Sequence, residues 1–427
     1  MQAGKNMKKR LFIKEKRNTD ILFLFFILFF CFFFFFWLFL LLRDPTGSQR
    51  GILFIDDKDF FMDWFNTVYY ALGRTPYTWG VAEDRNYAPI VYMLLYPFTR
   101  LYPYDISEGM TGEGRYLARY AQLPVVAAVF FLIGSFLMLF YVLYRSSRQR
   151  ESRRLILLLI LFMSGISMNS IERMNIQVLT SALLFAYVYI CDRDLLPGKL
   201  LTFTGLMCLA LPAAFKLFPA IFGILLLYRK HFKEAAAAFI LGVLTVLVPF
   251  LWVDQPFIEA FPAYISGVFR HSSYMTIADF GFSTPMMLEL LGGTSRDVMQ
   301  GFALIMLVLS IAGIYFLDSR WKRLALLSLP LILTSGQSGY YCLMFLFLPI
   351  VLFFDEEHSL ADIIYIIMFV LILSPLQRTA YINGTAVSAK GVINIVLILL
   401  NIILVAQAAV SFIHNKRSSG QNSIHTK

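Results

Sequence analysis

Four carboxylates that follow a long apolar run near the start of the chain are the first residues whose types and spacing could do chemistry. They are Asp56, Asp57, Asp59 and Asp63. Aromatic residues recur after Asp59 at helical spacing until Gly73, which predicts a short helix over 59–72 with Asp59 in its first turn and Asp63 one turn later. Such a carboxylate could take a proton from a substrate as a general base. The alternative is a helix cap, because the helix dipole favours a negative charge at this position.

Lys216 is a candidate of a different kind, a cation between two apolar runs with Pro212 and Pro219 on either side. The prolines make a broken helix plausible at this point. An ionisable residue within a membrane span is costly and is by default a functional candidate. Lys216 therefore either binds a phosphate at the outer membrane level or is a snorkelling or salt-bridged lysine.

Further cations lie in polar turns. Arg173 follows Glu172, so a surface ion pair and a ligand role are both open for it. Arg270 and His271 are adjacent and could clamp a phosphate, since a guanidinium offers fixed paired donors. No second His or Cys stands at ligand spacing from His271, so we predict no metal site.

Composition determines which elements must position these residues. Of 427 residues, 59% are hydrophobic and only 15% are charged, and the mean hydropathy is +0.68. Soluble domains carry about 45–50% apolar and about 25% charged residues, so a soluble protein is excluded. The apolar runs predict an all-α polytopic membrane protein with about 11–13 transmembrane helices. These runs lie near 20–42, 122–144, 155–170, 176–191, 199–214, 217–228, 235–253, 301–318, 324–335, 340–354, 359–374 and 392–412.

Basic residues give the orientation, because they concentrate on the cytoplasmic side of membrane proteins. Their clusters lie at 5–17, 145–154, 229–233, 320–323 and 416–417. They predict a multi-pass protein of the cell membrane with both termini cytoplasmic. Its parts are a basic N-terminus over 1–19, one transmembrane domain over 20–412 with outer segments at 43–121 and 254–300, and a tail over 413–427. The net charge of +10 is thus a topology signal, and no nucleic-acid partner is expected.

The first outer segment resembles that of a known family. Asp59, an aromatic-rich helix, Gly73 and Pro76-Tyr77 are followed by Tyr87-Ala88-Pro89 and an apolar helix. This order is similar to the first outer loop of the multi-spanning GT-C glycosyltransferases, and most of all to glycosyltransferase family 87. In that family an acid shortly after the first membrane helix is the catalytic carboxylate. The resemblance gives this role to Asp59, with Asp63 as a nearby alternative.

Two more stretches extend the resemblance to about residues 20–350. Residues 206–233 show an Ala- and Leu-rich helix, Lys216, Pro219, an aliphatic helix and a basic exit, which is similar to the family pattern. Residues 170–180, SIERMNIQVLT, resemble the polar outer turn of the same enzymes, with Asn175 and Gln177 at its polar positions. Order and spacing together support the resemblance more than any one motif.

The resemblance implies a GT-C-like bundle and an enzyme. It would move a hexose, mannose or another, from a polyprenyl-phosphate donor to an acceptor hydroxyl on a lipid or glycan at the outer membrane face, with inversion. Asp59 would be the general base, and the donor phosphate would be held by Lys216, Arg173, Arg270 and His271. Membrane lipids would be its other partners. No cofactor is predicted, although divalent metal occurs in some GT-C families, and the sequence leaves this alternative open.

A flippase for lipid-linked glycans, or another multi-spanning transporter, is the main alternative. Transporters built from inverted repeats place ionisable residues near the midplane in corresponding halves. This chain has its clustered acids in one outer segment and shows no visible repeat. A polymerase or ligase of lipid-linked glycans would favour a large late outer loop with several Arg and His, and 254–300 has few. The sequence therefore favours the transferase.

Overall fold

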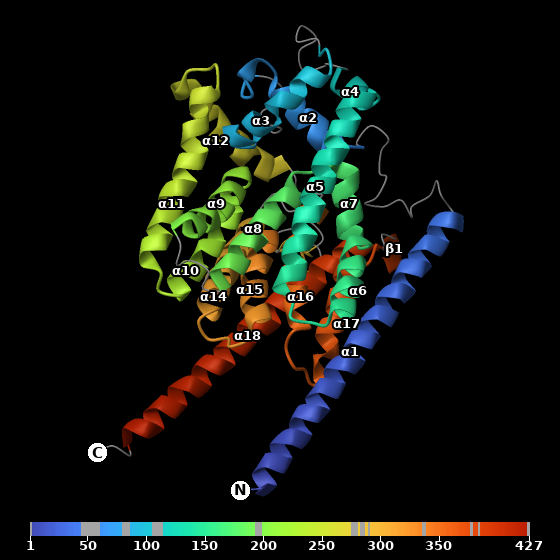
Figure 1. Ribbon diagram of the computed structural model, residues 1–427, viewed down its shortest axis with the longest axis vertical. Coiled ribbons are helices and arrows are strands. Elements are labelled where there is room, and N and C mark those ends of the chain that lie inside the picture. The colour runs from blue at the N-terminus through green and yellow to red at the C-terminus, as the bar shows by residue number, and fades with distance from the viewer. Residues whose placement is uncertain are drawn as a thin grey trace.

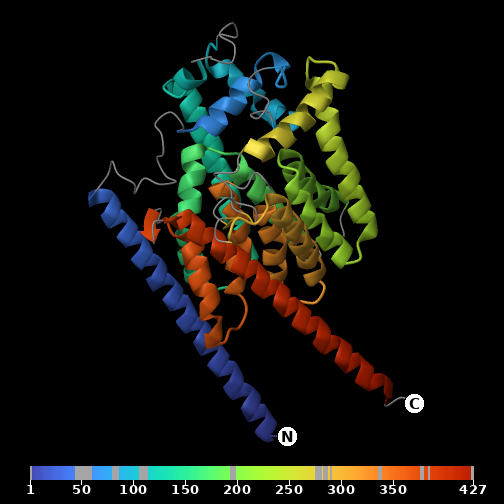
Figure 2. The same ribbon diagram turned by 180° about the vertical axis from the view of Figure 1, so that it is seen from behind.

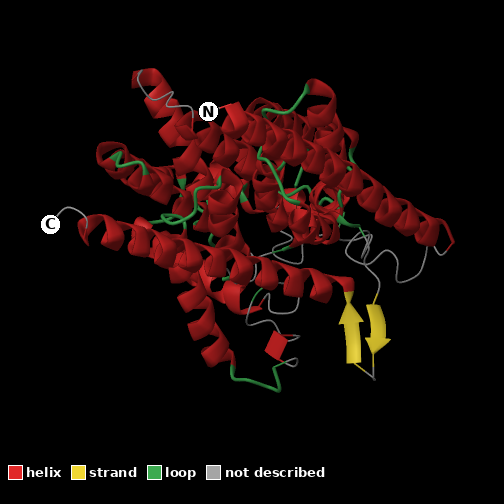
Figure 3. Cartoon of the chain, turned by 90° about the horizontal axis from the view of Figure 1, so that it is seen from below, coloured by secondary structure: helices red, strands yellow, loops and turns green. Residues whose placement is uncertain are grey.

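Helices form nearly all of the part of the chain that the computed structural model describes. This part comprises residues 2–43, 60–78, 86–104, 114–192, 199–274, 281, 287–288, 291–334, 339–375, 379–382 and 385–424. An antiparallel hairpin of β1 (Thr379–Ile382) and β2 (Thr385–Ser388) is the exception (Figure 3). The predicted all-α polytopic fold is therefore confirmed, and the hairpin is a small element that the sequence analysis did not predict.

Apolar helices make up the body of the molecule (Figure 1). Within the described residues, five are long and apolar enough to cross a membrane, and a bent pair adds a sixth candidate. The elements of the body are α1 (Gln2–Arg43), α5 (Gln122–Ser146), α6 (Glu151–Phe162), α7 (Gly165–Arg173), α8 (Gln177–Asp192), α9 (Lys199–Phe215), η5 (Phe218–Gly223), α10 (Ile224–Tyr228), α11 (Phe232–Leu247), η6 (Val248–Trp252), α14 (Arg296–Gly313), α15 (Arg320–Leu333), η8 (Tyr340–Leu346), α16 (Phe347–Phe353), η9 (Leu360–Asp362), α17 (Ile363–Leu373) and α18 (Ala389–Ile424).

Short helices from the two predicted outer segments gather at one end of the molecule. They are α2 (Met62–Tyr70), η1 (Leu72–Arg74), α3 (Pro89–Leu95), η3 (Tyr96–Leu101) and α4 (Gly114–Ala118) from the first segment, and α12 (Phe257–Tyr274) from the second. Figures 1 and 2 show these elements at one end, while both chain termini lie toward the opposite end. The described parts of the two predicted outer segments therefore form one cap over the bundle, which is called the outer cap below.

Arg74 joins the two outer segments. Its Nε donates a hydrogen bond of 2.8 Å to the carbonyl of Trp252, and its guanidinium forms an ion pair of 3.1 Å with Asp254. The N–H of Asp254 donates back to the Arg74 carbonyl at 2.9 Å. Beside these bonds the Tyr77 ring packs against Tyr264 of α12 with 5.9 Å between ring centroids. Polar and aromatic contacts thus fix the segments to each other.

The core of the bundle lies along α15 and α16. Every residue of α16 is buried, and the Trp321 ring of α15 packs against Phe353 with 5.1 Å between centroids. Peripheral helices instead expose large apolar side chains, for example Phe130 on α5 and Phe239 on α11. Exposed apolar faces of this kind mark surfaces that contact membrane lipids.

A bend of 53° separates α6 from α7, inside a run that the sequence analysis treats as one span. Ser164 has an extended backbone with ψ 153°, and its hydroxyl accepts a hydrogen bond from the N–H of Ser167 as a helix N-cap. The new helix ends at Arg173, and Met174 follows in the left-handed region with φ 52°. The short helix α7 thereby brings a polar turn to the level of the outer cap.

Candidate active site

Asp63 lies in the first turn of α2, where it is the acidic residue of that turn. The predicted helix start at residue 59 is wrong, because Phe61 has φ 62° and its N–H donates a hydrogen bond of 2.8 Å to the carbonyl of Glu172 instead of entering a helix. The start of α2 is therefore attached to the end of α7. Helices of this length depend on such tertiary contacts for their stability.

Arg173 and Asn175 both donate to the Asp63 carboxylate. The guanidinium of Arg173 approaches Oδ1 with its NH2 nitrogen at 2.6 Å and its Nε at 3.2 Å. The amide of Asn175 donates to Oδ2 at 2.7 Å. The left-handed backbone of Met174 turns the chain between the two donors. Both oxygens of Asp63 are thus occupied, and the side chain is only 15% exposed.

Arg173 forms its ion pair with Asp63 and not with the neighbouring Glu172. A surface ion pair with Glu172 was an alternative, but Glu172 is buried at 5% exposure and Arg173 pairs with Asp63. Charge-assisted bonds from a guanidinium with two nitrogens are among the stronger polar contacts in proteins. Arg173 is 30% exposed, so its outer side can still face a ligand.

Lys216 lies in the bend between α9 and η5, as the prolines around it predict. Its backbone N–H closes the last turn of α9 on Pro212, and Pro219 occupies the first turn of η5. The ammonium lies 4.5 Å from the ring centroid of Tyr341 and interacts electrostatically with Asp63. No carboxylate among the described residues lies within ion-pair distance of Lys216. An aromatic face thus holds the Lys216 ammonium near the site, and no described carboxylate pairs with it.

Tyr87 adds a hydroxyl to the Asp63 cluster. Its side chain hydrogen-bonds that of Asn175. Burial, and next the negative charge of Asp63, raise the pKa of the Tyr87 phenol above its ordinary value of 10.0. The hydroxyl therefore keeps its proton at any physiological pH. The sequence analysis used Tyr87 as part of a motif and gave it no role, and it did not identify Tyr341 at all.

The remaining predicted site residues lie on α12 or outside the part of the chain that the structure describes. Asp59, with Asp56 and Asp57, lies outside the described residues. Arg270 is exposed near the end of α12. The side chain of His271 lies outside the described part. The structure thus brings Asp63, Arg173 and Lys216 into one electrostatic cluster, and Asp59 and His271 stay sequence predictions.

A metal centre would need several liganding side chains in one place. Among the described residues, no group of three or more His, Cys, Asp and Glu side chains is arranged to hold a metal ion. The described site offers one carboxylate, two cations, an amide and phenol groups.

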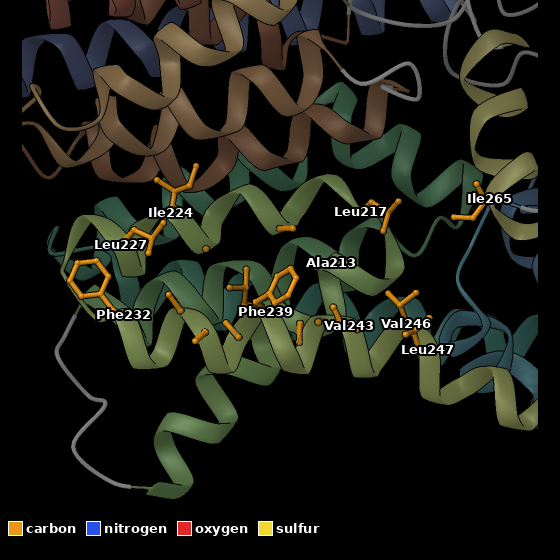
Figure 4. Close-up of a pocket in the computed structure, with 18 of the residues that line it drawn as sticks. Ala213, Leu217, Ile224, Leu227, Phe232, Phe239, Val243, Val246, Leu247 and Ile265 are labelled. Carbon is orange, nitrogen blue, oxygen red and sulfur yellow. The ribbon is translucent and has the colours of Figure 1, made fainter. Parts of the chain in front are cut away.

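An apolar groove of about 740 Å³ begins beside Lys216 (Figure 4). Leu217, the next residue in the chain, lines it, and the groove continues between α9 and α10 on one side and α11 on the other. Phe239 and Val243 of α11 lie on its wall, and Ile265 of α12 lines it at the outer cap. Because Phe239 is 72% exposed, the groove opens on the lipid-facing surface. Its lining suits a long hydrocarbon chain.

Comparison with known proteins identifies a family model that covers more than half of the chain. The model is that of glycosyltransferase family 87, and it matches residues 86–349. The match includes Arg173, Asn175, Lys216 and Tyr341, whereas α2 with Asp63 precedes it. No curated protein and no solved structure matches the chain.

Proposed function

Since the chain belongs to glycosyltransferase family 87, and is thus a membrane glycosyltransferase, we propose that it transfers a hexose such as mannose from a polyprenyl-phosphate donor to an acceptor hydroxyl. The reaction would take place at the outer membrane face, to which we assign the cap. The observation that carries this proposal is that Lys216, a cation with no described carboxylate partner, lies beside an apolar groove. A lipid phosphate combines an anionic headgroup, which would match Lys216, with a hydrocarbon chain, which would match the groove.

The donor phosphate is proposed to lie beside Lys216 with its chain in the groove. Lys216 has no described carboxylate partner, and Leu217 already lines the groove, so headgroup and chain would diverge at the α9–η5 bend. Arg173 would approach the phosphate from the other side of the cluster. Arg270 and His271 are proposed to complete the cation set from the second outer segment.

The chemistry is proposed as a single displacement at the anomeric carbon. The acceptor oxygen attacks C1 of the sugar, the bond from C1 to the phosphate oxygen breaks, and the configuration inverts. The acceptor proton passes to a carboxylate, and the new negative charge resides on the leaving polyprenyl phosphate. Lys216 and Arg173 stabilise that charge in a site partly shielded from water, which is where such electrostatic stabilisation is most effective.

Asp59 is the proposed general base. Asp63 is the other candidate, but its two oxygens already accept three hydrogen bonds from Arg173 and Asn175. A carboxylate has about four acceptor positions, so three of those of Asp63 are filled by donors that also fix its orientation. We therefore assign Asp63 a positioning role, which is to hold Arg173 and Asn175 in the site.

The test of the function is turnover by the purified full-length protein in lipid nanodiscs. Polyprenyl-phosphate mannose and polyprenyl-phosphate glucose, labelled in the sugar, are supplied with lipid extracts of the source cells. Release of polyprenyl phosphate together with a labelled product of opposite anomeric configuration is expected for one donor. Mass spectrometry of lipids and glycans lost on deletion of the gene would name the acceptor. Passage of an intact donor across proteoliposomes without consumption would support a flippase and overturn the proposal.

A further inference from the structure

A second cavity, of about 540 Å³, lies in the outer cap away from the apolar groove. The 3-10 helices η1 and η3 and the residues after η3 form it. Its lining includes Gly73, Tyr96, Thr99, Arg100, Tyr102 and Tyr104. This lining is more polar than that of the groove, because tyrosines, a threonine and an arginine lie beside Leu72, Leu101 and Pro103.

Aromatic faces and hydrogen-bond donors alternate around this cavity. The rings of Tyr102 and Tyr104 lie 4.9 Å apart with 66° between their planes, so they present surfaces in two directions. The Arg100 guanidinium lies 5.8 Å from the centroid of the Tyr96 ring, and its NH2 nitrogen is 3.4 Å from the Tyr96 hydroxyl. Within the described residues, the hydroxyls of Tyr102 and Tyr104 have no hydrogen-bond partner. They are available to a ligand.

These features fit a carbohydrate better than other ligands. A sugar ring has an apolar C–H face that packs on an aromatic ring and a rim of hydroxyls that need donors and acceptors. A lipid chain would leave the Tyr102 and Tyr104 hydroxyls without partners, which costs free energy. A phosphate site would be expected to gather several cations, and among the described residues Arg100 is the single cation that lines the cavity.

The cavity is connected to the Asp63 cluster by α2. Asp63 lies at the start of this helix, and Gly73, just beyond its end, lines the cavity. Tyr69 of α2 packs against Tyr104 with 5.8 Å between ring centroids. α2 continues for seven residues after Asp63, which at a rise of about 1.5 Å each puts its far end about 10 Å from Asp63, and the cavity lies just beyond that end.

We propose that this cavity binds a sugar unit of the acceptor. The inference rests on the proposed function, because it assigns the acceptor to the class of saccharide-bearing molecules. One sugar would lie on Tyr102 and Tyr104 with its hydroxyls at Arg100. The glycan would then extend along α2 and present its reacting hydroxyl near the carboxylates.

Direct binding tests the inference without any turnover. The full-length protein in detergent micelles is titrated with mannotetraose, maltotetraose and chitotetraose, and binding is followed by saturation-transfer NMR and calorimetry. Tyr102→Leu and Arg100→Ala alter the cavity. Tyr120→Leu is the matched control, since Tyr120 is 72% exposed, forms an Arg–Tyr pair with Arg119 and does not line the cavity.

At least one tetrasaccharide is expected to bind the unaltered protein and the Tyr120→Leu variant, and to bind both cavity variants about tenfold or more weakly. No binding by any of the three sugars, or equal binding by all variants, would overturn the inference. Donor affinity is measured on the same preparations with polyprenyl phosphate. Donor binding without sugar binding would refute only the acceptor subsite, whereas sugar binding without donor turnover would refute only the proposed function.

Discussion

Asp63 and Arg173, which are 110 residues apart in the chain, are joined by two hydrogen bonds from one guanidinium to one carboxylate oxygen. Asp63 belongs to the outer cap and Arg173 to the last turn of α7, so the pair connects the cap to the bundle. Asn175 completes the connection by donating a hydrogen bond to the other carboxylate oxygen of Asp63. The cluster that would handle substrate charge is thus also a structural joint, and variants there have to be tested for both effects.

The base is tested by replacing each acid with the isosteric amide. General-base catalysis contributes about 10²–10⁴-fold, so Asp59→Asn should transfer at no more than about a hundredth of the normal rate while binding donor and unfolding normally. Asp63→Asn should lose less activity and should lower the apparent melting temperature, because Arg173 loses its charged partner. Single-turnover rates and thermal unfolding in detergent measure the two effects. Near-normal transfer by Asp59→Asn with collapse in Asp63→Asn would make Asp63 the base.

The donor phosphate is tested with Lys216→Met, which keeps the apolar stem without the charge. Binding of polyprenyl phosphate should weaken about tenfold or more, since a charged hydrogen bond is worth about 1.5–3 kcal/mol. Arg270→Ala should weaken it as well. Lys233→Met, a change in the α10–α11 region at the other end of the bundle, is the control and should leave donor affinity unchanged. Unaltered affinity in both Lys216→Met and Arg270→Ala would give these residues a structural role.

Binding of the donor's hydrocarbon chain in the apolar groove is tested at Gly242. This residue lines the groove and has open space where a side chain would begin. Gly242→Phe should fill the groove and weaken binding of a long-chain polyprenyl phosphate about tenfold, because each excluded methylene costs about 0.8 kcal/mol of burial. A citronellyl-length analogue should bind as before. Gly134→Phe on α5, which also meets no atom within 4 Å, is the matched control. Equal chain-length dependence in both variants would exclude the groove as the binding site.

Close packing at the start of α7 gives a stability prediction. A side chain at Gly165 would lie 2.8 Å from the Tyr340 hydroxyl and 2.9 Å from the Pro375 Cα, and the latter is backbone that cannot rotate away. Gly165→Ala should therefore destabilise the protein by about 1–3 kcal/mol. Gly134→Ala should be neutral or stabilising, because it lies in a helix with free space around it. Thermal unfolding of the two variants in the same detergent compares them, and an equal melting temperature would contradict the packing argument.

Orientation is tested by single cysteines in a protein from which the four native cysteines have been removed. Tyr120 and Arg150 flank α5 and are both exposed, so burial does not separate them. An impermeant maleimide should label Tyr120→Cys in intact cells and Arg150→Cys only after the membrane is opened. Ser147, in the same turn as Arg150, is a poor probe, since it is buried and bonded to Asp355. The reverse labelling pattern would invert the topology and remove the outer-face site.

The helices were predictable where hydropathy alone decides them. The span predicted at 122–144 is α5, Gln122–Ser146, and the break expected around Lys216 separates α9 from η5. The bend at Ser164 was missed although Gly165 follows it, because a single glycine inside an apolar run does not by itself end a helix. The bend also depends on long-range packing, since Gly165 lies directly against the Tyr340 hydroxyl and the Pro375 backbone. Local sequence rules do not contain such tertiary contacts.

The site was predictable residue by residue but not as a constellation. Lys216 was noticeable because a charge beside an apolar run is expensive. The bond between Arg173 and Asp63 was not predictable, since Glu172 is the neighbouring acid in the chain and only the fold brings Asp63 closer. Tyr341 lies in an apolar run and carries no signal of its own. Its place over Lys216 follows from how η8 packs into the bundle.

The exposed wall of the apolar groove determines how a ligand would meet this protein. Phe239 and Val243 open it sideways on α11, so a hydrocarbon chain would enter by diffusion in the plane of the bilayer and never cross water. The encounter rate then depends on the mole fraction of ligand among lipids and on membrane viscosity. Adding inert lipid or detergent at constant total ligand would slow the enzyme as a competitive inhibitor does, through surface dilution alone.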